Sequence, residues 1–338
     1  MYSIHDCAGE KGDRMNDIKE KAVLNIGSNK EIFSVIIPSY LRVFELERAI
    51  NSILIQHEFV QKIIVVDDKS DNIEEIRNAI KKIDNKKILL IENDFKSNAA
   101  YTRNQGARLA KTEWICFLDS DDIFLPKKLA KVYNAINSTD EVDVIYTQAK
   151  MYYNDYFEKN RPDRPLNNDE HISEYIFCDN QMMQTSTLTI RSNFFHNHGF
   201  NENLSRHQDY DLALKFSEVG AHILYLEFPG TAIYWYSKNG PQQKGESVEY
   251  SYQWLLDNAN RMTKKARNDF YYYYVVLKAA RHGRKKEALK FYQASTGMSL
   301  SIKQYFIFWG VMLCPHSMYQ SLFDCYKKNK SKFNTKQA

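Results

Sequence analysis

The sequence predicts an α/β fold with a mostly parallel sheet flanked by helices, followed by a helical C-terminal region. Three observations lead to this prediction. Short apolar runs alternate with segments of helical spacing, which favours a parallel sheet. Two of the runs end in acids, as expected at the ligand-binding edge of such a sheet. Strand-like runs disappear after Tyr250, where long helical patterns begin.

Four apolar runs early in the chain have the length and composition of buried strands. They are Phe33–Pro38, Lys62–Asp68, Lys87–Ile91 and Trp114–Leu118. The segments that follow these strands repeat apolar residues at the spacing of an amphipathic helix. They are Val43–Ile55, Asp71–Ile83, Asn98–Ala110 and Pro126–Ile136. This regular alternation is the main support for a parallel arrangement.

The middle of the chain predicts further strands, joined by a Pro- and Asn-rich loop at Asn160–Asn168. The predicted strands are Val142–Met151, Met183–Ile190, Ile223–Phe228 and Thr231–Tyr236. A short helix is expected at the end of Phe200–Gly220, with Asp209 and Asp211 in its first turn. The sheet is therefore expected to continue beyond the first four strands.

Composition and charge restrict the class of protein. The chain has 338 residues, 43% of them hydrophobic, which is ordinary for a protein with a real core. The net charge of +4 is too small to indicate nucleic acid, so no nucleic-acid partner is expected. The five cysteines form no CxxC pair, which favours reduced thiols and a cytoplasmic location. No secretory signal and no apolar run of about 20 residues is found.

The composition divides the chain into three parts. Residues 1–31 are expected to be a flexible leader, 32–245 the α/β domain, and 246–338 a basic, aromatic-rich helical region. Ten Lys or Arg stand between Arg261 and Lys290 against two acids, and YFIFWGVMLC follows at 305–314. This region can be interpreted as an anchor at an anionic membrane surface. The alternative is a helical cap whose aromatics form a core.

The stretch WICFLDSDDIFLP, at 114–126, carries the clearest chemical signal. A buried strand ends in three acids within four positions, namely Asp119, Asp121 and Asp122. Charged side chains are rarely buried without a partner or a metal. An Asp-x-Asp pair at a sheet edge suits a divalent cation that also binds a diphosphate. The alternative is a solvated acidic loop that caps the next helix.

Four motifs together resemble a family 2 glycosyltransferase with the Rossmann-like GT-A fold. They are FSVIIPSYLR, IIVVDDKSDN, NAAYTRNQGARLAKTEWICFLDSDD and HQDYDLALKF. Their order and spacing match the family, and the resemblance covers roughly residues 32–237. The chain has no QxxRW motif and no membrane-spanning run, both expected of processive synthases, so transfer of a single sugar is expected.

The resemblance implies a nucleotide site and a metal ligand. The implied nucleotide-binding residues are Pro38, Ser39, Tyr40, Asp68, Arg103, Asn104, Asp119 and Ser120. Asp68 would accept a hydrogen bond from the base, Asp119 would face the ribose, and Asp121 would bind Mn²⁺ or Mg²⁺. Asp122 is expected to be structural. The structural alternatives are a packing role for Tyr40, helix capping by Asp68 and a surface position for Arg103.

The resemblance also implies that Asp209, in the Gln208-Asp209 pair, is the catalytic base. A carboxylate that takes the proton of an acceptor hydroxyl makes it a better nucleophile. Direct attack would invert the anomeric centre. Asp211 is expected to cap the helix and compensate its dipole, and His207 either lines the acceptor site or is polar surface.

The resulting functional hypothesis is a transferase of bacterial surface polysaccharide or lipopolysaccharide synthesis. A nucleotide-sugar donor, with UDP favoured over dTDP and GDP, would supply a glycan or lipid-linked acceptor at the inner face of the cell membrane. Two alternatives are a sugar-nucleotide nucleotidyltransferase and a binding module that has lost its chemistry. The first expects a Gly-rich loop after the first strand, where this chain has SYLR. The second is disfavoured by the joint presence of Asp68, Asp121 and Asp209.

Overall fold

A computed structural model describes residues 30–139, 141–153, 156–235, 247–294 and 301–315, with positions 317–318 and 321. The predicted leader lies outside the described residues except for its last two positions. The boundary predicted near residue 245 also lies outside them, because 236–246 are not described.

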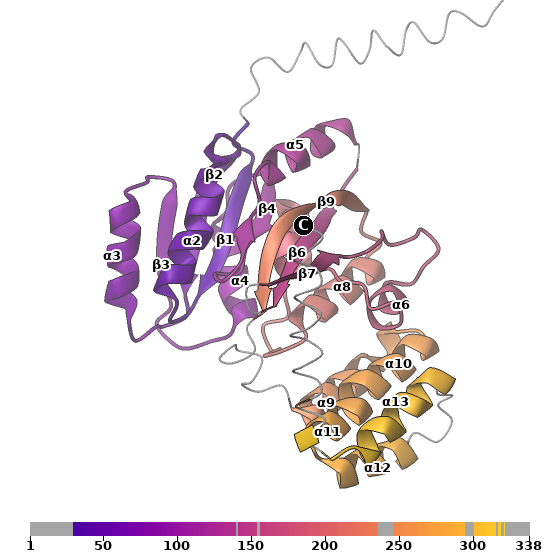
Figure 1. Cartoon of the computed structure of the whole chain (residues 1–338). Coiled ribbons are helices and arrows are strands. Elements are labelled where there is room, and N and C mark those ends of the chain that lie inside the picture. The colour runs from indigo at the N-terminus through magenta and orange to yellow at the C-terminus, as the bar shows by residue number, and fades with distance from the viewer. Residues whose placement is uncertain are drawn as a thin grey trace, which may run out of the picture.

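The described chain forms a nine-stranded mixed sheet (Figure 1). In spatial order the strands are β3 (Ile88–Glu92), β2 (Val60–Asp67), β1 (Phe33–Ser39), β4 (Trp114–Phe117), β8 (Leu188–Arg191), β6 (Val144–Tyr153), β9 (Ile223–Trp235) and β5 (Ile123–Phe124), with β7 (Tyr156–Arg161) paired to β6. The run from β3 to β4 is parallel throughout, and β6 is parallel to β9. The remaining pairs are antiparallel. The predicted α/β class is confirmed.

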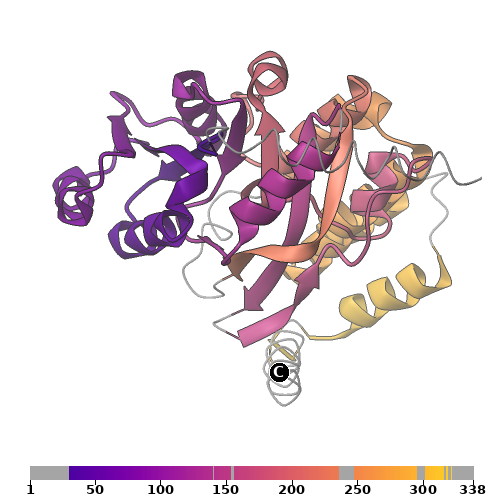
Figure 2. The same cartoon turned by 90° about the horizontal axis from the view of Figure 1, so that it is seen from above.

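Helices cover both faces of the sheet because the buried strand residues alternate between two cores. Val35 and Ile37 of β1 face the core beneath α2 (Val43–Leu54), α3 (Ile73–Ile83) and α5 (Lys128–Ser138). Ile36 faces the opposite core. The helices on that side are α4 (Ala99–Leu109), α6 (Ile172–Phe177), α7 (Ser192–His198) and α8 (Gln208–Glu218). Figure 2 shows α2 and α3 beside the first strands, at one end of the molecule.

Gly106 lets α4 approach the sheet closely. A Cβ at this position would lie 2.5 Å from Ile36 Cγ2 and 3.1 Å from Val66 Cγ2, so a larger residue would force the helix outward. Because α4 also carries Arg103 and Asn104, this contact sets the position of two predicted site residues.

The C-terminal helices form a layer on the side of the molecule away from α5 (Figure 1). They are α9 (Val248–Asn258), α10 (Lys264–Phe270), α11 (Leu277–Arg281), α12 (Lys285–Ala294) and α13 (Ile302–Leu313). A π-helical turn, Tyr271–Val276, joins α10 to α11. This layer shares one continuous core with α6 and α8.

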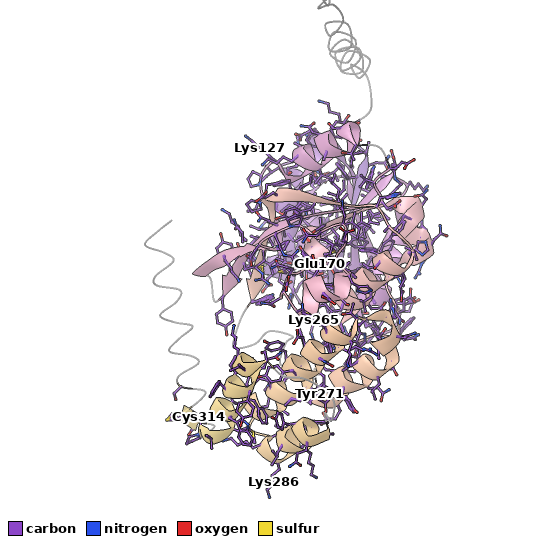
Figure 3. The ribbon with its side chains drawn as sticks, turned by 90° about the vertical axis from the view of Figure 1, so that its right-hand side faces the viewer. Lys127, Glu170, Lys265, Tyr271, Lys286 and Cys314 are labelled. Atoms are coloured by element: carbon purple, nitrogen blue, oxygen red, sulfur yellow. The ribbon has the colours of Figure 1, made fainter. Side chains whose placement is uncertain are left out.

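The aromatic run of the C-terminal region is largely core. Phe270, Tyr271 and Tyr272 are all buried, and Phe270 packs edge-on against Phe177 of α6 with ring centroids 5.0 Å apart. Figure 3 shows Tyr271 inside the helical layer. For these residues the helical-cap interpretation is therefore correct. No helix in the described part of the chain combines the length and apolarity needed to cross a bilayer.

Several predicted elements differ from the structure. The strand predicted at Met183–Ile190 is wrong in its first half, because Gln184 caps a 3₁₀ turn at Thr185–Thr187 and strand β8 starts only at Leu188. The two strands predicted at Ile223–Phe228 and Thr231–Tyr236 are one strand, β9, whose register against β6 shifts on both sides of Gln148. The final predicted residue, Tyr236, lies outside the described residues. Sequence periodicity also missed β5, β7, α6 and α7, all of which are short.

Candidate active site

A cavity of about 1650 Å³ opens at the carboxyl ends of β1, β2 and β4. Nine of the ten predicted site residues line it: Pro38, Ser39, Tyr40, Asp68, Arg103, Asp119, Ser120, Asp121 and Asp209. They come from loops that follow three parallel strands and from α4 and α8. The parallel sheet explains the convergence, since its strand ends meet at one edge.

Asn104 is the predicted residue that does not line the cavity. Its amide nitrogen donates to Phe200 O at 2.8 Å and to Glu202 Oε1 at 2.9 Å, and its oxygen accepts from Phe200 N at 3.0 Å. The side chain therefore fastens α4 to the segment before α8. The structure assigns it a packing role instead of contact with a ligand in the cavity.

Asp68 is buried at the end of β2 and is surrounded by hydrogen-bond donors. Its Oδ2 accepts from Lys96 Nζ at 2.6 Å, and Oδ1 accepts from Ser97 N at 2.8 Å, the Ser97 hydroxyl, and Asn93 Nδ2 at 3.2 Å. Burial raises the pKa of Asp68, but the hydrogen bonds from Lys96 and Ser97 lower it by more, so the net pKa is below its ordinary value. Asp68 is thus an ionised acceptor, and Oδ2 has capacity for a second donor.

Asp67 has a local structural role in the turn after β2, although neither it nor Asp68 caps α3, whose N-cap residue is Asn72. Asp67 accepts from Ser70 N at 2.7 Å and from Ser70 Oγ at 2.6 Å, and Ser70 Oγ in turn accepts from Leu41 N at 2.8 Å. These bonds tie the end of β1 to the end of β2. Beside them, Lys96 Nζ lies 3.0 Å from the centre of the Tyr40 ring, so the lysine contacts both Asp68 and Tyr40.

Arg103 links the acidic loop to α8. It is buried, which excludes the surface position that was the alternative to nucleotide binding. Its Nη2 pairs with Asp119 Oδ1 at 2.5 Å, and its Nη1 donates to Gln208 Oε1 at 2.9 Å. Burial alone would lower the pKa of Arg103, but the charges of Asp119 and Asp209 hold it above its ordinary value. A permanent positive charge therefore lies between the two acidic motifs.

Asp121 and Asp122 concentrate negative charge at the cavity. Asp121 pairs with Arg42, and its backbone oxygen accepts from Arg48 Nη2. Burial raises the pKa of Asp121; Arg42 opposes this effect and Asp119 adds to it. Burial also raises the pKa of Asp122 well above its ordinary value, and the charges of Asp121 and Asp119 contribute. Each raised pKa shows that ionising a buried carboxylate beside other carboxylates is unfavourable, and a bound cation would reduce that cost.

The 3₁₀ turn Thr185–Thr187 holds both acidic motifs. Ser186 Oγ accepts from Asp119 N at 3.0 Å and donates to Asp122 Oδ2 at 2.6 Å. The adjacent Thr185 hydroxyl donates to Asp209 Oδ1. Gln184, which caps the turn, lies 3.5 Å from Asp119 Oδ2. One short turn therefore contacts Asp119, Asp122 and Asp209.

Lys128 of α5 supports this turn through its side-chain amine. The side chain is fully buried, and its Nζ donates to Ser186 O at 2.8 Å and to Thr231 Oγ1 at 3.0 Å. Burial lowers the pKa of Lys128 to about 7, although Cys116 and Asp122 act to raise it. The lysine thus binds the turn as a donor within an apolar layer.

Asp209 lies in the first turn of α8 and is half-buried. Burial raises its pKa, while the charge of Arg103 and the Thr185 hydrogen bond limit the increase. The residue before the helix, His207, adopts φ 61°, which is uncommon for a residue with a side chain. Its ring stacks on Tyr210 at 5.4 Å, and its Nε2 lies 3.0 Å from Ser251 Oγ. These contacts orient the start of α8 toward the cavity.

Asp211 does not cap α8 through a side-chain hydrogen bond, so the capping part of that prediction is wrong, although its place in the first turn suits dipole compensation. Its buried carboxylate pairs with Arg261 at 2.5 Å, and Arg261 Nε also pairs with Glu218 at 2.6 Å. Asp211 therefore connects α8 to the C-terminal helical layer. The two acids of the HQDYD motif face different partners.

The carboxylates at the cavity fit a cation that is shared with a substrate. Within the described ranges, no group of three or more His, Cys, Asp or Glu side chains is arranged to hold an ion alone. Magnesium takes one or two protein carboxylates and completes its shell with phosphate oxygens and water. Asp121, with Asp119 nearby, is suited to that mode of binding.

The C-terminal layer supplies part of the cavity wall. Tyr274, Lys278 and His282 line it, as do Lys159 of β7 and Arg206 before α8. Sequence reasoning missed these residues, together with Arg42, Lys96 and the turn at Thr185–Thr187. Arg42 had a signal, since it lies in the FSVIIPSYLR motif. The others had none, because only folding brings them to the strand ends.

The sheet, its acid-lined carboxyl edge and the helix that carries Asp209 define a GT-A glycosyltransferase. Residues 34–206 match the model of glycosyl transferase family 2, and the chain belongs to that family. It is 31% identical over 229 residues to the amylovoran biosynthesis glycosyltransferase AmsB of Erwinia amylovora, covering 66% of this chain and 76% of AmsB. The enzyme class and the family expected from the motifs are confirmed.

One further relative and one solved structure extend the similarity beyond the motifs. An uncharacterised glycosyltransferase of Haemophilus influenzae is 26% identical over 290 residues, covering 84% of this chain and 96% of that protein. The crystal structure of S. aureus TarS 1–349 in complex with UDP-GlcNAc superposes with a TM-score of 0.51 at 16% identity, covering 82% of this chain and 79% of TarS 1–349. The TarS comparison supports the fold.

Proposed function

We propose that this enzyme is an inverting, metal-assisted glycosyltransferase that moves one sugar from UDP to a hydroxyl of a glycan or lipid-linked acceptor. The observation that carries the proposal is that Asp68, Asp121 and Asp209 line one cavity. The pathway would be bacterial polysaccharide synthesis, as for the similar AmsB. The presence of UDP-GlcNAc in the similar TarS structure supports UDP as the nucleotide.

The donor would lie along the ends of β1, β2 and β4. The Oδ2 atom of Asp68 suits an N–H of uracil, and Tyr40, which is 40% exposed, offers an aromatic surface to the base. Asp119 and Ser120 would contact the ribose, and Arg103 would hold Asp119 in position. Lys96 would have to yield part of its contact with Asp68 and Tyr40 when the base enters.

Asp121 would hold a divalent cation, Mn²⁺ or Mg²⁺, together with the donor diphosphate. When bound, the cation would offset the negative charge that develops on the leaving diphosphate. The pKa values of Asp121 and Asp122 are raised by burial and by neighbouring carboxylates, and this supports the assignment, since a bound cation would stabilise the ionised forms. Asp122, bonded to Ser186, would keep the loop in shape.

Asp209 would act as general base on the acceptor. The acceptor oxygen forms a bond to the anomeric carbon, and its proton passes to Asp209. The bond from that carbon to the diphosphate oxygen breaks, and the electron pair leaves with UDP. A raised pKa makes Asp209 a stronger base than an ordinary carboxylate, which suits this transfer. Because attack comes from the face opposite the leaving group, an α-linked donor gives a β-linked product.

The outer face of α13 supports peripheral contact with an anionic membrane. Ile302 and Leu313 are each 79% exposed and Phe306 is 68% exposed, which is unusual for large apolar side chains. Lys303 lies exposed on the same helix, and Lys286 is at the end of the helical layer far from the sheet (Figure 3). Apolar and basic side chains together are typical of a helix that lies at a membrane surface.

The test is a donor assay that needs no knowledge of the acceptor, because water can take the acceptor position. The enzyme is incubated with UDP-, GDP- and dTDP-sugars, with and without Mn²⁺ or Mg²⁺, and nucleotide release is measured. We expect release from a UDP-sugar only with metal, and NMR should detect the inverted anomer first. Retention of the anomer, or full activity in a chelator, would contradict the mechanism.

Asp209→Asn separates binding from chemistry in the same assay. The variant should bind UDP normally and lose turnover by at least about a hundredfold, the usual contribution of a general base. Asp257→Asn is the control for turnover, since Asp257 is exposed on α9 and does not line the cavity. Normal turnover by Asp209→Asn would remove the base assignment.

A further inference from the structure

One face of the segment formed by the π-helical turn Tyr271–Val276 and α11 lines the cavity beside the proposed base. Tyr274 lies in the π-helical turn Tyr271–Val276, Lys278 lies in α11, and His282 directly follows α11, each four positions from the next. All three line the cavity. The π-helical turn Tyr271–Val276 contains Tyr274, and π-helical segments inside helices are frequent at functional sites. This face belongs to the region that family resemblance does not cover.

The row of three residues starts next to Asp209. The Tyr274 hydroxyl lies 2.8 Å from the hydroxyl of Tyr210, the residue that follows Asp209 in α8. The Tyr274 ring stacks on Phe270 with centroids 4.6 Å apart, and Phe270 is fully buried. The start of the row is therefore held rigidly against α8. Lys278 and His282 are the next residues of the row and lie farther from Tyr210.

The charge of the wall changes along the cavity. The acids that line the nucleotide side are Glu45, Asp68, Asp119, Asp121 and Asp122. Among the described lining residues that follow Asp122 in the chain, Asp209 is the single acid. The cations in that second group are Lys159, Arg161, Arg206 and Lys278, of which Arg161 pairs with Asp163 at 3.1 Å, and the group also contains His207 and His282. The wall formed by this second group is therefore mostly cationic, whereas the nucleotide side has five acids against Arg42, Lys96 and Arg103.

We propose that this wall is an acceptor subsite for an anionic group, a phosphate or a carboxylate, carried by the acceptor glycan. The proposal rests on the proposed function, since it takes Asp209 as the base and the strand ends as the donor side. Lys278 and Arg206 would bind the anion, and Tyr274 would position the acceptor beside Asp209. A charged contact across a partly enclosed cavity is stronger than one at an open surface. The C-terminal layer would thus select the acceptor.

The experiment measures binding of three oligomers of equal length with UDP present to fill the donor side. The probes are a glycerol-phosphate oligomer, an oligogalacturonate and a neutral maltooligosaccharide. Calorimetry at low salt gives Kd for the wild type, Lys278→Glu and Lys278→Gln. Lys286→Glu is the matched control, because Lys286 is an exposed lysine of the same helical layer that does not line the cavity (Figure 3).

We expect the wild type to bind at least one anionic oligomer about tenfold more tightly than the neutral one, with high salt removing the difference. Lys278→Glu should lose that preference, Lys286→Glu should keep it, and the Kd for UDP should not change. The preferred oligomer then distinguishes phosphate from carboxylate. If Lys278→Glu is unfolded by circular dichroism, Lys278→Gln provides the comparison.

Two results would overturn the subsite. One is equal affinity of the wild type for charged and neutral oligomers. The other is an anionic preference that survives in both Lys278 variants. A loss of UDP affinity in Lys278→Glu would also count against it, because the wall would then serve the donor. Failure of the wild type to bind UDP at all would instead contradict the proposed function, so the two failures are distinguishable.

Discussion

Thr185 and Arg103 adjust the protonation of Asp209 from two sides of the cavity. Burial raises the pKa of Asp209, the charge of Arg103 lowers it, and the Thr185 hydroxyl lowers it further by donating to Oδ1. The net pKa lies above the ordinary value. Because a general base must be deprotonated, activity should be present above this pKa and lost as pH falls through it.

Thr185→Val should move that acid limb to higher pH. The substitution keeps the side-chain shape and removes the hydrogen bond that favours the carboxylate, so the pKa of Asp209 rises. The measurement is kcat/KM against pH. Thr187→Val is the control, because the Thr187 hydroxyl donates to Gln184 O at 2.7 Å in the same turn and does not contact Asp209. An acid limb at the wild-type position would show that Thr185 does not influence the base.

One short element, the turn Thr185–Thr187, holds several residues of the site. The turn Thr185–Thr187 bonds to both acidic motifs, and Lys128 of α5 donates to its Ser186 carbonyl. Thr231 Oγ1 also donates to that carbonyl at 2.8 Å. Two donors therefore bind the Ser186 carbonyl, so the removal of one donor still leaves this carbonyl with a hydrogen bond.

Lys128→Met should change how stability depends on pH. The folded pKa is lowered to about 7 from an ordinary 10.5, so between these values the unfolded chain binds a proton that the folded chain does not. Wild-type stability should therefore rise with pH across this window, by about 1.4 kcal/mol per unit from this group. Denaturant unfolding at pH 7.5 and 9.5 should show a smaller increase in Lys128→Met. Lys131→Met, at an exposed position of the same helix, should follow the wild type.

The apolar face of α13 is expected to bind anionic lipid. Phe306→Glu should abolish co-flotation with vesicles that contain phosphatidylglycerol, since it adds a negative charge to the face proposed to meet the lipid. Phe44→Glu is the matched control, because Phe44 is 73% exposed but belongs to α2, which is distant from α13 in the sequence. Wild-type protein that ignores anionic vesicles at low salt would exclude the membrane role.

The whole molecule depends on the junction between the α/β part and the C-terminal layer. Phe177 of α6, His207 before α8 and Trp254 of α9 meet Phe270 in one aromatic cluster. Arg261 adds an ion pair to the buried Asp211. Because α8 carries Asp209, this junction couples the stability of the helical layer to the geometry of the cavity.

Arg261→Met should destabilise the enzyme by roughly 3–5 kcal/mol, because it leaves the buried carboxylate of Asp211 without its cation. The free energy of unfolding in urea is the measurement. Arg284→Met should cost little, since Arg284 pairs with the exposed Glu249 and Glu287. Equal effects of the two substitutions would show that burial at the junction does not matter.

Local sequence patterns were enough to predict the first four strands and the edge where the acids lie. Parallel strands bring their carboxyl ends together, so Asp68 and Asp121 could be expected near each other before the structure was known. Asp209 was expected there through family resemblance alone. Asn104 shows the limit of such transfer, since a motif does not reveal whether an amide faces a ligand or a neighbouring loop.

Local sequence was sufficient to predict the strand–helix alternation and the acids at the strand ends, because these depend on residues close in the chain, and the four motifs were sufficient for the family. Tertiary structure alone decided what surrounds Asp209, namely Thr185, Arg103 and the row from Tyr274 to His282. It also decided that Phe270–Tyr272 face protein. An aromatic helix has the same apolar pattern whether it packs against lipid or protein, and only long-range packing selects between them.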